Sequence, residues 1–327
     1  MLLEVKNLTT EFKLKRGIVK AVDDISFTID KGEILAIVGE SGSGKSVTSL
    51  SIMGLLQNPG RVTGGQILYK SQDLNKLSRK EQQKLRGNQI SMIFQEPMTS
   101  LNPVWRIKDQ IMESIMLHMK LSKKEALART IEMLETVGIP SAAQRANDYP
   151  HQMSGGMRQR VMTAMALACE PELLIADEPT TALDVTIQAQ ILELLYRMRE
   201  KFHMAVMLIT HDLGVVSEAA DRVIVMYCGK IMEEADVRSL FNHPLHPYTI
   251  GLLKSIPQID NDSDEPLYMI KGMVPNPLNM PKGCPFSDRC EQSMERCTQE
   301  MPQLREIDGH KVRCFLYDAK EGGSGKQ

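Results

Sequence analysis

The sequence predicts an α/β fold with a parallel core sheet, an antiparallel β subdomain and an inserted helical subdomain. Short apolar runs rich in β-branched residues alternate with helical patterns along most of the chain. The run "EILAIVG" (33–39) is apolar and continuous, as expected of a strand buried on both faces of a sheet. Mostly helical sequence separates "ISMIFQ" (90–95) from "LLIAD" (173–177), and this interval is too long for a simple crossover.

The other elements follow in chain order. "LLEVKNL" (2–8) and "VDDISFTI" (22–29) alternate apolar and polar residues and predict an antiparallel pair of strands. Further strand candidates are "QILYK", "AVMLIT" and "RVIVMY". Helical patterns over 108–120 and 122–137 place the inserted helical subdomain at about 98–165.

The composition of the chain changes after about residue 240. We expect one large domain over 1–240 and a small, loop-dominated module over 241–320, because the later segment is rich in Pro, Asn and Asp. The last residues, 321–327, are rich in Gly and polar residues and predict a flexible tail.

The overall charge and hydropathy exclude several classes of protein. The formal net charge is −2 over 327 residues, which does not favour a nucleic-acid partner. No apolar run approaches the ~20 residues that a membrane-spanning helix needs. The N-terminus "MLLEVKNLTTEFKLK" interrupts its apolar residues with acidic and polar ones, unlike a signal peptide. We therefore expect a soluble chain that reaches a membrane only through a partner.

The segment "GESGSGKS" (39–46) fits the G-x-x-x-x-G-K-[ST] pattern of a phosphate-binding loop. It follows the buried strand and precedes the helical run "SVTSLSIMGLL", which is the context that the pattern requires. Glycines let backbone N–H groups turn inward around phosphates, and the helix N-terminus adds the positive end of its dipole. Lys45 is expected to reach the β- and γ-phosphates, and Ser46 to ligate Mg²⁺. The predicted ATP-binding residues of the loop are Gly39, Ser41, Gly42, Ser43, Gly44, Lys45 and Ser46.

A second part of the site is predicted where "LLIADEPT" (173–180) ends in two carboxylates. A buried strand ending in Asp177 places a carboxylate beside the Mg²⁺ at the C-terminal edge of the sheet. Glu178 is then the candidate to orient and polarise the attacking water. An Asp–Glu pair alone is commonly a solvated strand end. Together with the phosphate loop it indicates a P-loop nucleoside triphosphatase.

The segment "SGGMRQR" (154–160) resembles the signature motif of ATP-binding cassette (ABC) ATPases. Ser154, Gly155 and Gly156 offer a hydroxyl group and unhindered N–H groups at a helix N-terminus, which suits an anion. The resemblance implies that this surface caps the γ-phosphate held by an opposite subunit, so that two head-to-tail cassettes enclose two ATP molecules. Positions 153 and 157 are Met where many members have Leu and Gln, which leaves open whether the partner ATPase is identical.

Other residues match elements of the same family in chain order. Gln95 in "IFQEP" matches the glutamine that contacts Mg²⁺ or water and links to the membrane subunit, and His211 in "LITHD" matches a histidine that contacts the γ-phosphate. Asp184 in "TALD" matches a residue that communicates across the dimer. Phe12, expected in the loop after the first strand, matches the aromatic that stacks on adenine. The resemblance thus implies Glu178, His211 and Gln95 as catalytic residues, with ATP and Mg²⁺ as ligands.

The C-terminal region resembles the ATPase subunits of bacterial oligopeptide and dipeptide importers, in "HPLHPYT" (243–249) and "PNPLNMPKGCPFSDRC" (275–290). This resemblance implies ATP-driven peptide import at the cytoplasmic face of a bacterial membrane. The implied partners are two transmembrane permease subunits, a second ATPase subunit that is non-identical, and indirectly an extracytoplasmic peptide-binding protein. The alternatives are an importer of nickel or another small solute, and a soluble ABC ATPase without a role in transport.

Four of the six cysteines follow one another near the C-terminus as C-x5-C-x6-C-x16-C: Cys284, Cys290, Cys297 and Cys314. Disulfides are disfavoured in a reducing compartment, and zinc sites usually show paired C-x2–4-C spacings. A [4Fe–4S] cluster tolerates wider spacing, and the family that the chain resembles carries such a cluster in this region. We expect a [4Fe–4S] cluster in a structural role, with Zn²⁺ or free cysteines as alternatives. Cys169 and Cys228 are expected to be small buried residues.

Overall fold

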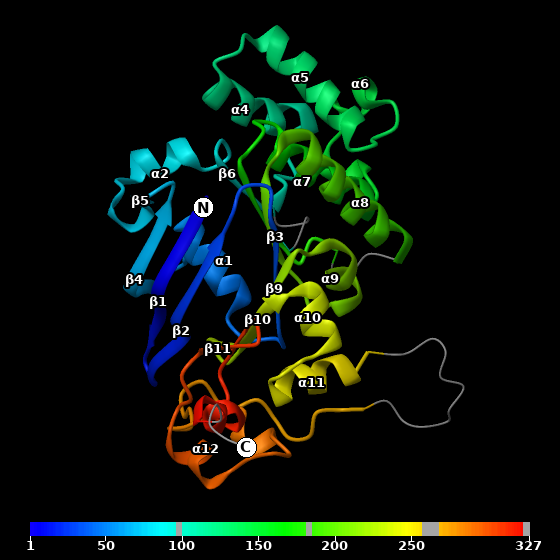
Figure 1. Ribbon diagram of the computed structural model, residues 1–327. Helices are drawn as coiled ribbons and strands as arrows, with labels where there is room; N and C mark the ends of the chain where they lie inside the picture. Colours follow the sequence, from blue (N-terminus) through cyan, green and yellow to red (C-terminus); the bar gives the residue numbers. More distant parts are fainter. Residues whose placement is uncertain (96–99, 181–184, 257–267, 323–327) are drawn as a thin grey trace, which may run out of the picture.

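Two β-sheets form the centre of the molecule (Figure 1). The computed structural model describes residues 1–95, 100–180, 185–256 and 268–322. Within these residues, the larger sheet has the strand order β11-β12-β10-β9-β3-β8-β7-β6, and the smaller one has the order β2-β1-β4-β5. The predicted combination of a parallel core with an antiparallel β subdomain is confirmed.

The parallel part of the larger sheet consists of β3 (Ile34–Val38), β6 (Ile90–Ile93), β7 (Leu173–Asp177), β8 (Ala205–Ile209) and β9 (Arg222–Tyr227). All five residues of β3 are buried. Successive side chains of a strand point to opposite faces, so Ala36 packs with the helices on one face and Ile37 with the smaller sheet on the other. Burial on both faces explains why these strands are continuous apolar runs in the sequence.

The smaller sheet is built on a long hairpin of β1 (Leu3–Leu14) and β2 (Gly17–Ile29), flanked by β4 (Gly60–Tyr69) and the short β5 (Gln72–Asp73). Phe12 lies within β1, opposite Val19 of β2 and Gly60 of β4. The expectation that Phe12 lies in a loop was therefore wrong. The strand continues because both of its edges are hydrogen-bonded, one to β2 and the other to β4.

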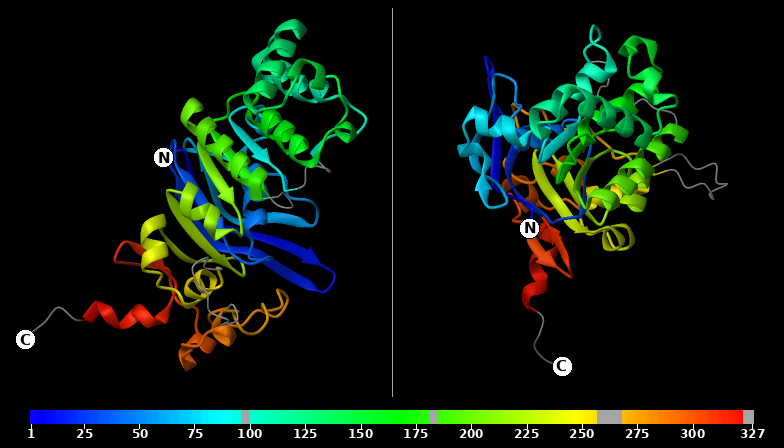
Figure 2. Two further views of the ribbon diagram at one scale, coloured as in Figure 1. Left: turned by 90° about the vertical axis from the view of Figure 1, so that its right-hand side faces the viewer. Right: turned by 90° about the horizontal axis from the view of Figure 1, so that it is seen from above.

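The predicted helical patterns are confirmed as α4 (Ile107–Met119) and α5 (Lys123–Thr136). With α6 (Ala142–Arg145) and α7 (Gly155–Leu167) they gather at one end of the molecule, which the two further views also show (Figure 2). Helix α5 begins at a capping box formed by Ser122 and Glu125. The remaining helices are α1 (Lys45–Met53), α2 (Arg79–Leu85), α8 (Val185–Phe202), α9 (Leu213–Ala219), α10 (Val237–Asn242), α11 (Pro247–Lys254) and α12 (Glu295–Gln299). Short 3₁₀ helices are η1 (Leu74–Lys76), η2 (Pro150–Gln152), η3 (Ser287–Arg289) and η4 (Phe315–Gly322).

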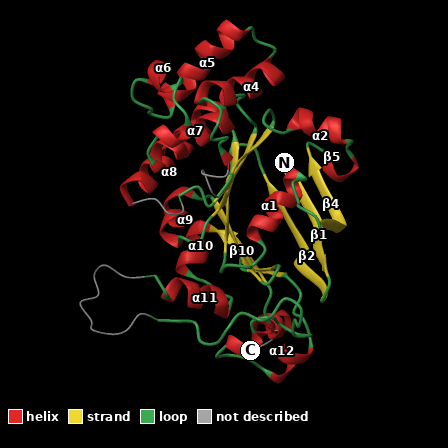
Figure 3. Cartoon of the chain, turned by 180° about the vertical axis from the view of Figure 1, so that it is seen from behind, coloured by secondary structure: helices red, strands yellow, loops and turns green. Residues whose placement is uncertain are grey.

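The C-terminal segment returns to the larger sheet. β11 (Arg305–Ile307) and β12 (His310–Val312) form a hairpin, and β12 pairs antiparallel with β10 (Lys230–Asp236). The view from behind shows α12 on the side of the sheets away from α4 and α5 (Figure 3). Residues 321 and 322 belong to η4, and the rest of the expected tail lies outside the described residues. None of the described helices is long and apolar enough to cross a membrane.

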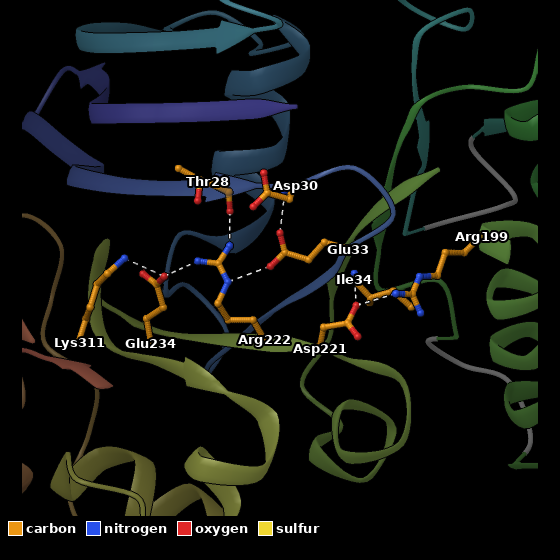
Figure 4. A network of polar contacts seen from close by, with 9 residues as sticks. All are labelled: Thr28, Asp30, Glu33, Ile34, Arg199, Asp221, Arg222, Glu234 and Lys311. Carbon is orange, nitrogen blue, oxygen red and sulfur yellow. Dashed lines mark hydrogen bonds and ion pairs between the residues drawn. The ribbon is translucent and has the colours of Figure 1, made fainter. Parts of the chain in front are cut away.

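A polar network centred on Arg222 joins these parts (Figure 4). Its guanidinium donates to Glu33, at 2.9 Å, and to the carbonyl of Thr28, at the end of β2. It also pairs with Glu234 of β10, which Lys311 of β12 contacts at 3.0 Å. One partly buried arginine therefore connects the smaller sheet with two strands of the larger one.

Candidate functional site

The phosphate loop joins β3 to α1 and depends on glycines at specific positions. Gly39, Gly42 and Gly44 have positive φ angles of 150°, 78° and 102°. A Cβ atom at Gly39 would lie 2.1 Å from the carbonyl oxygen of Met226, and one at Gly44 would lie 2.4 Å from that of Ala21. Only glycine fits both the backbone conformation and the space at these two positions.

Lys45 lies inside this loop. Its Nζ donates to the carbonyl oxygens of Gly39, at 2.7 Å, and Glu40, at 3.1 Å, and the residue is only 5% exposed. Burial lowers the pKa of Lys45, while the carboxylates of Glu178, Asp177 and Glu40 oppose this shift. The ammonium group is thus held at the centre of the loop, where a phosphate can replace the carbonyl oxygens as its partner.

Asp177 and two serine hydroxyls meet at the end of β7. Ser46 Oγ donates to Asp177 Oδ1 at 2.9 Å, and Ser49 Oγ lies 3.3 Å from Asp177 Oδ2. Burial raises the pKa of Asp177, and the hydrogen bonds from the serines oppose this shift. A carboxylate and a hydroxyl on one small cluster are the oxygen ligands that Mg²⁺ prefers, so these residues fit the expected ion.

Glu178, Gln95 and His211, which the family resemblance implies as catalytic residues, come together in the structure, and their catalytic roles stay a prediction. Gln95 Nε2 donates to Glu178 Oε2 at 2.9 Å, and His211 Nδ1 lies 3.6 Å from Glu178 Oε1. They follow β6, β7 and β8, which are neighbours in the sheet, so the three side chains meet at one edge. Glu178 has a φ of 46°, and its N–H donates to the carbonyl of Ile209. This arrangement can hold a carboxylate in a fixed orientation beside the phosphate loop.

The signature segment begins helix α7. Ser154 is the N-cap of this helix, and its Oγ accepts from the N–H of Met157 at 3.3 Å. A Cβ atom at Gly155 would meet nothing within 4 Å, so the backbone there is open to an approaching group. The buried Gln159 donates to the carbonyl of Pro179 at 2.5 Å, which connects the helix to the segment after Glu178.

The predicted roles of two other residues, Phe12 and Asp184, are not tested by the structure. Phe12 lies against Gly60, where a Cβ atom would come within 2.6 Å of the Phe12 ring, and its role with adenine stays a prediction. Asp184 lies outside the described residues.

Four cysteines of the C-terminal segment line one small cavity, although they come from a loop, α12 and the segment after β12. All four have free thiols. The pKa of Cys284 is raised to about 12 and that of Cys314 to about 11, mainly by burial and to a smaller extent by the charges of neighbouring cysteines. The cavity is lined by Cys284, Cys290, Cys297 and Cys314 together with His246, Pro247, Phe286, Ser287, Gln292, Pro302, Phe315 and Leu316.

The cysteines do not converge on one point. Among the described residues, no group of three or more His, Cys, Asp or Glu side chains is arranged to hold a single metal ion. Thiolates bound to a [4Fe–4S] cluster attach to four separate irons and therefore lie farther apart than those on one Zn²⁺. The four thiols share one cavity, and no metal site is found among the described residues.

Sequence reasoning missed one contact of the phosphate loop. Arg289, which precedes Cys290, forms a two-pronged ion pair with Glu40 of the loop, at 2.6 and 3.0 Å. The two residues are 249 positions apart. No local pattern signals such a pair, because each residue alone resembles an ordinary surface charge.

The fold and site together define an ATP-binding cassette. The family model described as "ABC transporter" matches residues 22–181, and the one described as "Oligopeptide/dipeptide transporter, C-terminal region" matches residues 232–297. A dimeric structure of MJ0796, described as a bacterial ABC transporter cassette, aligns with a TM-score of 0.66 at 30% identity. The alignment covers 72% of this chain and 99% of that one.

The curated relatives are more specific. The chain is 57% identical to the oligopeptide transport ATP-binding protein AppD of Bacillus subtilis, over 97% of both chains. It is 50% identical to the oligopeptide transport ATP-binding protein OppD of Escherichia coli, over 96% of this chain and 93% of that one. The chain belongs to the family of ABC ATPases that includes the oligopeptide and dipeptide transport ATP-binding proteins.

Proposed function

We propose that this chain hydrolyses ATP to power the import of oligopeptides or dipeptides through a membrane ABC transporter. The observation that carries the proposal is the meeting of Glu178, Gln95 and His211 beside a formed phosphate loop, in a chain similar to peptide-transport ATPases over nearly its whole length. The named relatives transport peptides, and the match of the C-terminal family model extends this similarity beyond the ATPase core.

The residues of the site divide the chemistry among themselves. Lys45 and the N–H groups of the loop bind the phosphates, and Glu178 accepts a proton from the attacking water. Gln95 and His211 hold the Glu178 carboxylate in the orientation that this proton transfer requires. Mg²⁺, which Ser46 and Asp177 would hold, neutralises phosphate charge when it is bound.

The site needs a second cassette to enclose the nucleotide. Ser154 caps α7, and Gly155, the first residue of that helix, has an open backbone, which suits the γ-phosphate of a partner subunit. The solved structure of MJ0796 is described as dimeric. Met153 and Met157 flank this surface, and we propose that the partner is a non-identical ATPase subunit.

A groove between the core and the helical end is the proposed contact with a permease subunit. It lies next to Gln95 in the chain and contains Phe94 of the loop after β6 and Leu117 of α4, which are 37% and 68% exposed. Exposed apolar side chains around a groove favour an apolar partner helix. We therefore propose that the chain is a peripheral subunit at the cytoplasmic face of the membrane, where it binds two permease subunits. The peptide-binding protein acts on the chain only through these permeases.

The C-terminal module is proposed to hold a [4Fe–4S] cluster on its four cysteines, with Zn²⁺ as the alternative. Support comes from the shared cavity, which all four cysteines line. The proposed division of the chain is an ABC domain over 1–240, with its helical subdomain at about 98–165, the module over 241–320 and a tail over 321–327.

Replacing Glu178 tests the hydrolytic assignment. Glu178→Gln keeps the shape and the contact with Gln95 but removes the base, so we expect ATP turnover to fall by about 100-fold or more. Binding of ATP, measured with a fluorescent analogue, should remain within a few-fold of the original. Turnover unchanged in the variant would contradict the role of Glu178.

Uptake by cells tests the substrate. Deleting the gene should abolish uptake of radiolabelled dipeptides and tetrapeptides, and expression of the intact chain should restore it, whereas the Glu178→Gln variant should not. Uptake of ⁶³Ni²⁺ should not change. Loss of nickel uptake with normal peptide uptake would assign the chain to the alternative class of importer.

A further inference from the structure

The loop that binds phosphate and the segment that carries the cysteines are in direct contact. Arg289 ends the 3₁₀ helix η3 and is followed by Cys290, whose side chain lines the cysteine cavity. Its guanidinium pairs with both carboxylate oxygens of Glu40, the second residue of the phosphate loop. The Arg289 side chain is only 6% exposed, so this ion pair is far less screened than a surface one.

Two further N–H donors of Arg289 are also engaged. Nη1 donates to Tyr227 Oη at 3.1 Å, and Nε donates to the carbonyl of Lys271 at 3.1 Å. The guanidinium lies over the rings of Tyr227 and Phe286, with 5.7 and 5.8 Å to their centroids. Because several elements hold the Arg289 side chain in one place, its guanidinium fixes the position of the Glu40 carboxylate.

Glu40 in turn is attached at each of its polar groups. Its N–H donates to Tyr248 Oη of α11 at 2.9 Å, its carbonyl accepts from Lys45 Nζ at 3.1 Å, and its carboxylate is held by Arg289. The same residue therefore contacts the C-terminal segment through its side chain and the phosphate-binding lysine through its backbone. A shift of Arg289 would reach Lys45 through one residue.

The cavity and the ion pair also share a wall. Phe286 lines the cysteine cavity, and its ring contacts those of Tyr227 and Tyr248 at centroid distances of 5.5 and 5.3 Å. Tyr227 and Tyr248 are the hydroxyl partners of Arg289 and of the Glu40 N–H. A change in what fills the cavity would move this aromatic group, because close-packed rings transmit displacement.

We propose that Arg289 is a positioning residue for ATP binding, which acts through Glu40 and makes the affinity of the nucleotide site depend on the state of the cysteine site. The proposal rests on the function proposed above, namely ATP at the phosphate loop and a metal cluster at the cysteines. Loss of the cluster or of a cysteine ligand releases η3, the ion pair loosens, and the phosphate loop binds ATP less tightly.

The first experiment measures nucleotide affinity of the full chain by titration with the fluorescent, non-hydrolysable analogue MANT-AMPPNP. Arg289→Ala should weaken binding by about tenfold, since it leaves the Glu40 carboxylate without its buried partner. The KM for ATP should rise similarly, whereas kcat should stay within about twofold, because the groups around Glu178 are untouched. Arg289→Lys should restore part of the affinity, since it returns the charge without the two-pronged geometry.

Lys311→Ala is the matched control. Lys311 belongs to the same module and pairs with Glu234 of β10 at 3.0 Å, and it does not line the cysteine cavity. This variant should bind the analogue like the unmodified chain. Equal weakening by Lys311→Ala would mean that any loss of a cation from the module lowers affinity, and it would overturn the specific role of Arg289.

A double-variant cycle separates positioning from general destabilisation. If Arg289 acts through Glu40, then Glu40→Gln with Arg289→Ala should bind the analogue no more weakly than the worse single variant. If the factors by which the two single substitutions weaken binding multiply in the double variant, then the two residues act independently, and the proposal is overturned. An affinity of Arg289→Ala within twofold of the original would overturn it as well.

The link to the cysteine site is tested with Cys290→Ser. This variant should weaken MANT-AMPPNP binding in the original background and cause no further loss in the Arg289→Ala background. Unchanged affinity of Cys290→Ser, or an equal loss in both backgrounds, would contradict the link. Lys45→Ala separates a failure of the proposed nucleotide site from a failure of this inference. Retained ATP hydrolysis in Lys45→Ala would contradict the nucleotide site itself. Lost hydrolysis in Lys45→Ala, together with unchanged nucleotide affinity of Arg289→Ala, would contradict only the role of Arg289.

Discussion

The nucleotide site and the cysteine site are neighbours that differ in how far the chain organises them without a ligand. At the nucleotide site, Lys45, Asp177 and Glu178 already have partners within the chain, at 2.7 to 2.9 Å. At the cysteine site, four thiols surround a cavity, and burial raises the pKa of Cys284, Cys290 and Cys314. The first site is preorganised, whereas at the second the proposed cluster would have to stabilise the thiolates.

This difference reflects the elements that carry the residues. The nucleotide residues stand at the ends of neighbouring, fully buried strands, so the core holds them. The cysteines are spread over loops and one helix of five residues, α12. A segment with so little regular structure gains much of its order from cross-links or metals.

The largest expected effect breaks the preorganised site. Lys45→Ala removes the buried ammonium group, so we expect ATP hydrolysis to fall by about 100-fold or more, as for other removed electrostatic contacts to a transferring phosphate. The far-ultraviolet circular dichroism spectrum should not change, because the sheet does not depend on this side chain. Lys311→Ala, which removes an exposed partner of Glu234, is the control and should retain activity. Hydrolysis by Lys45→Ala at the original rate would refute the site.

The next effect concerns the cysteine site. Protein purified without oxygen should be brown, contain about four irons per chain, and bleach on reduction. The Cys284→Ser variant should lose most of its iron. Its free energy of unfolding should fall by several kcal/mol, because the binding energy of the metal at such a site is also folding energy. Cys169→Ser should keep its iron, since Cys169 lies beside Ser114, away from the cavity. Colourless protein with one zinc per chain would replace the cluster by the alternative.

The smallest expected effect tests how strongly the hydroxyls around Asp177 preorganise the nucleotide site. Ser49→Ala removes the more distant of the two hydroxyls near Asp177, so we expect the free energy of unfolding to fall by about 1 kcal/mol. Turnover should decrease by only a few-fold, because Ser46 still holds the carboxylate. Urea denaturation and steady-state ATPase assays measure these two changes. A loss as large as that of Lys45→Ala would show that the site depends on its whole serine cluster.

Much of the nucleotide site is visible in the sequence because its residues occupy short motifs with a fixed structural context. A phosphate loop is contiguous, and its glycines, lysine and serine act within one turn of chain. The carboxylates at 177 and 178 end a run whose apolar character comes from burial on both faces. Gln95 and His211 were located through the family resemblance, and the order of the strands explains why they meet Glu178.

The position of Phe12 shows that the local alternation of apolar and polar residues does not predict where a strand ends. Strand alternation predicted an end near residue 8, whereas the hairpin continues to Leu14 because pairing with β2 and β4 extends it. Such pairing depends on partners up to about fifty residues away, and a window of a few residues does not contain it.

The sequence by itself determined the class of protein, since the chemistry of phosphate binding requires particular residues at contiguous positions. The tertiary structure alone decided how the cysteine segment relates to that chemistry. It returns two strands to the larger sheet and places Arg289 against Glu40, 249 positions away in the chain. An ion pair at that separation is specified by the packing of the whole fold, because Coulomb attraction depends on distance in space and leaves no period or motif in the chain.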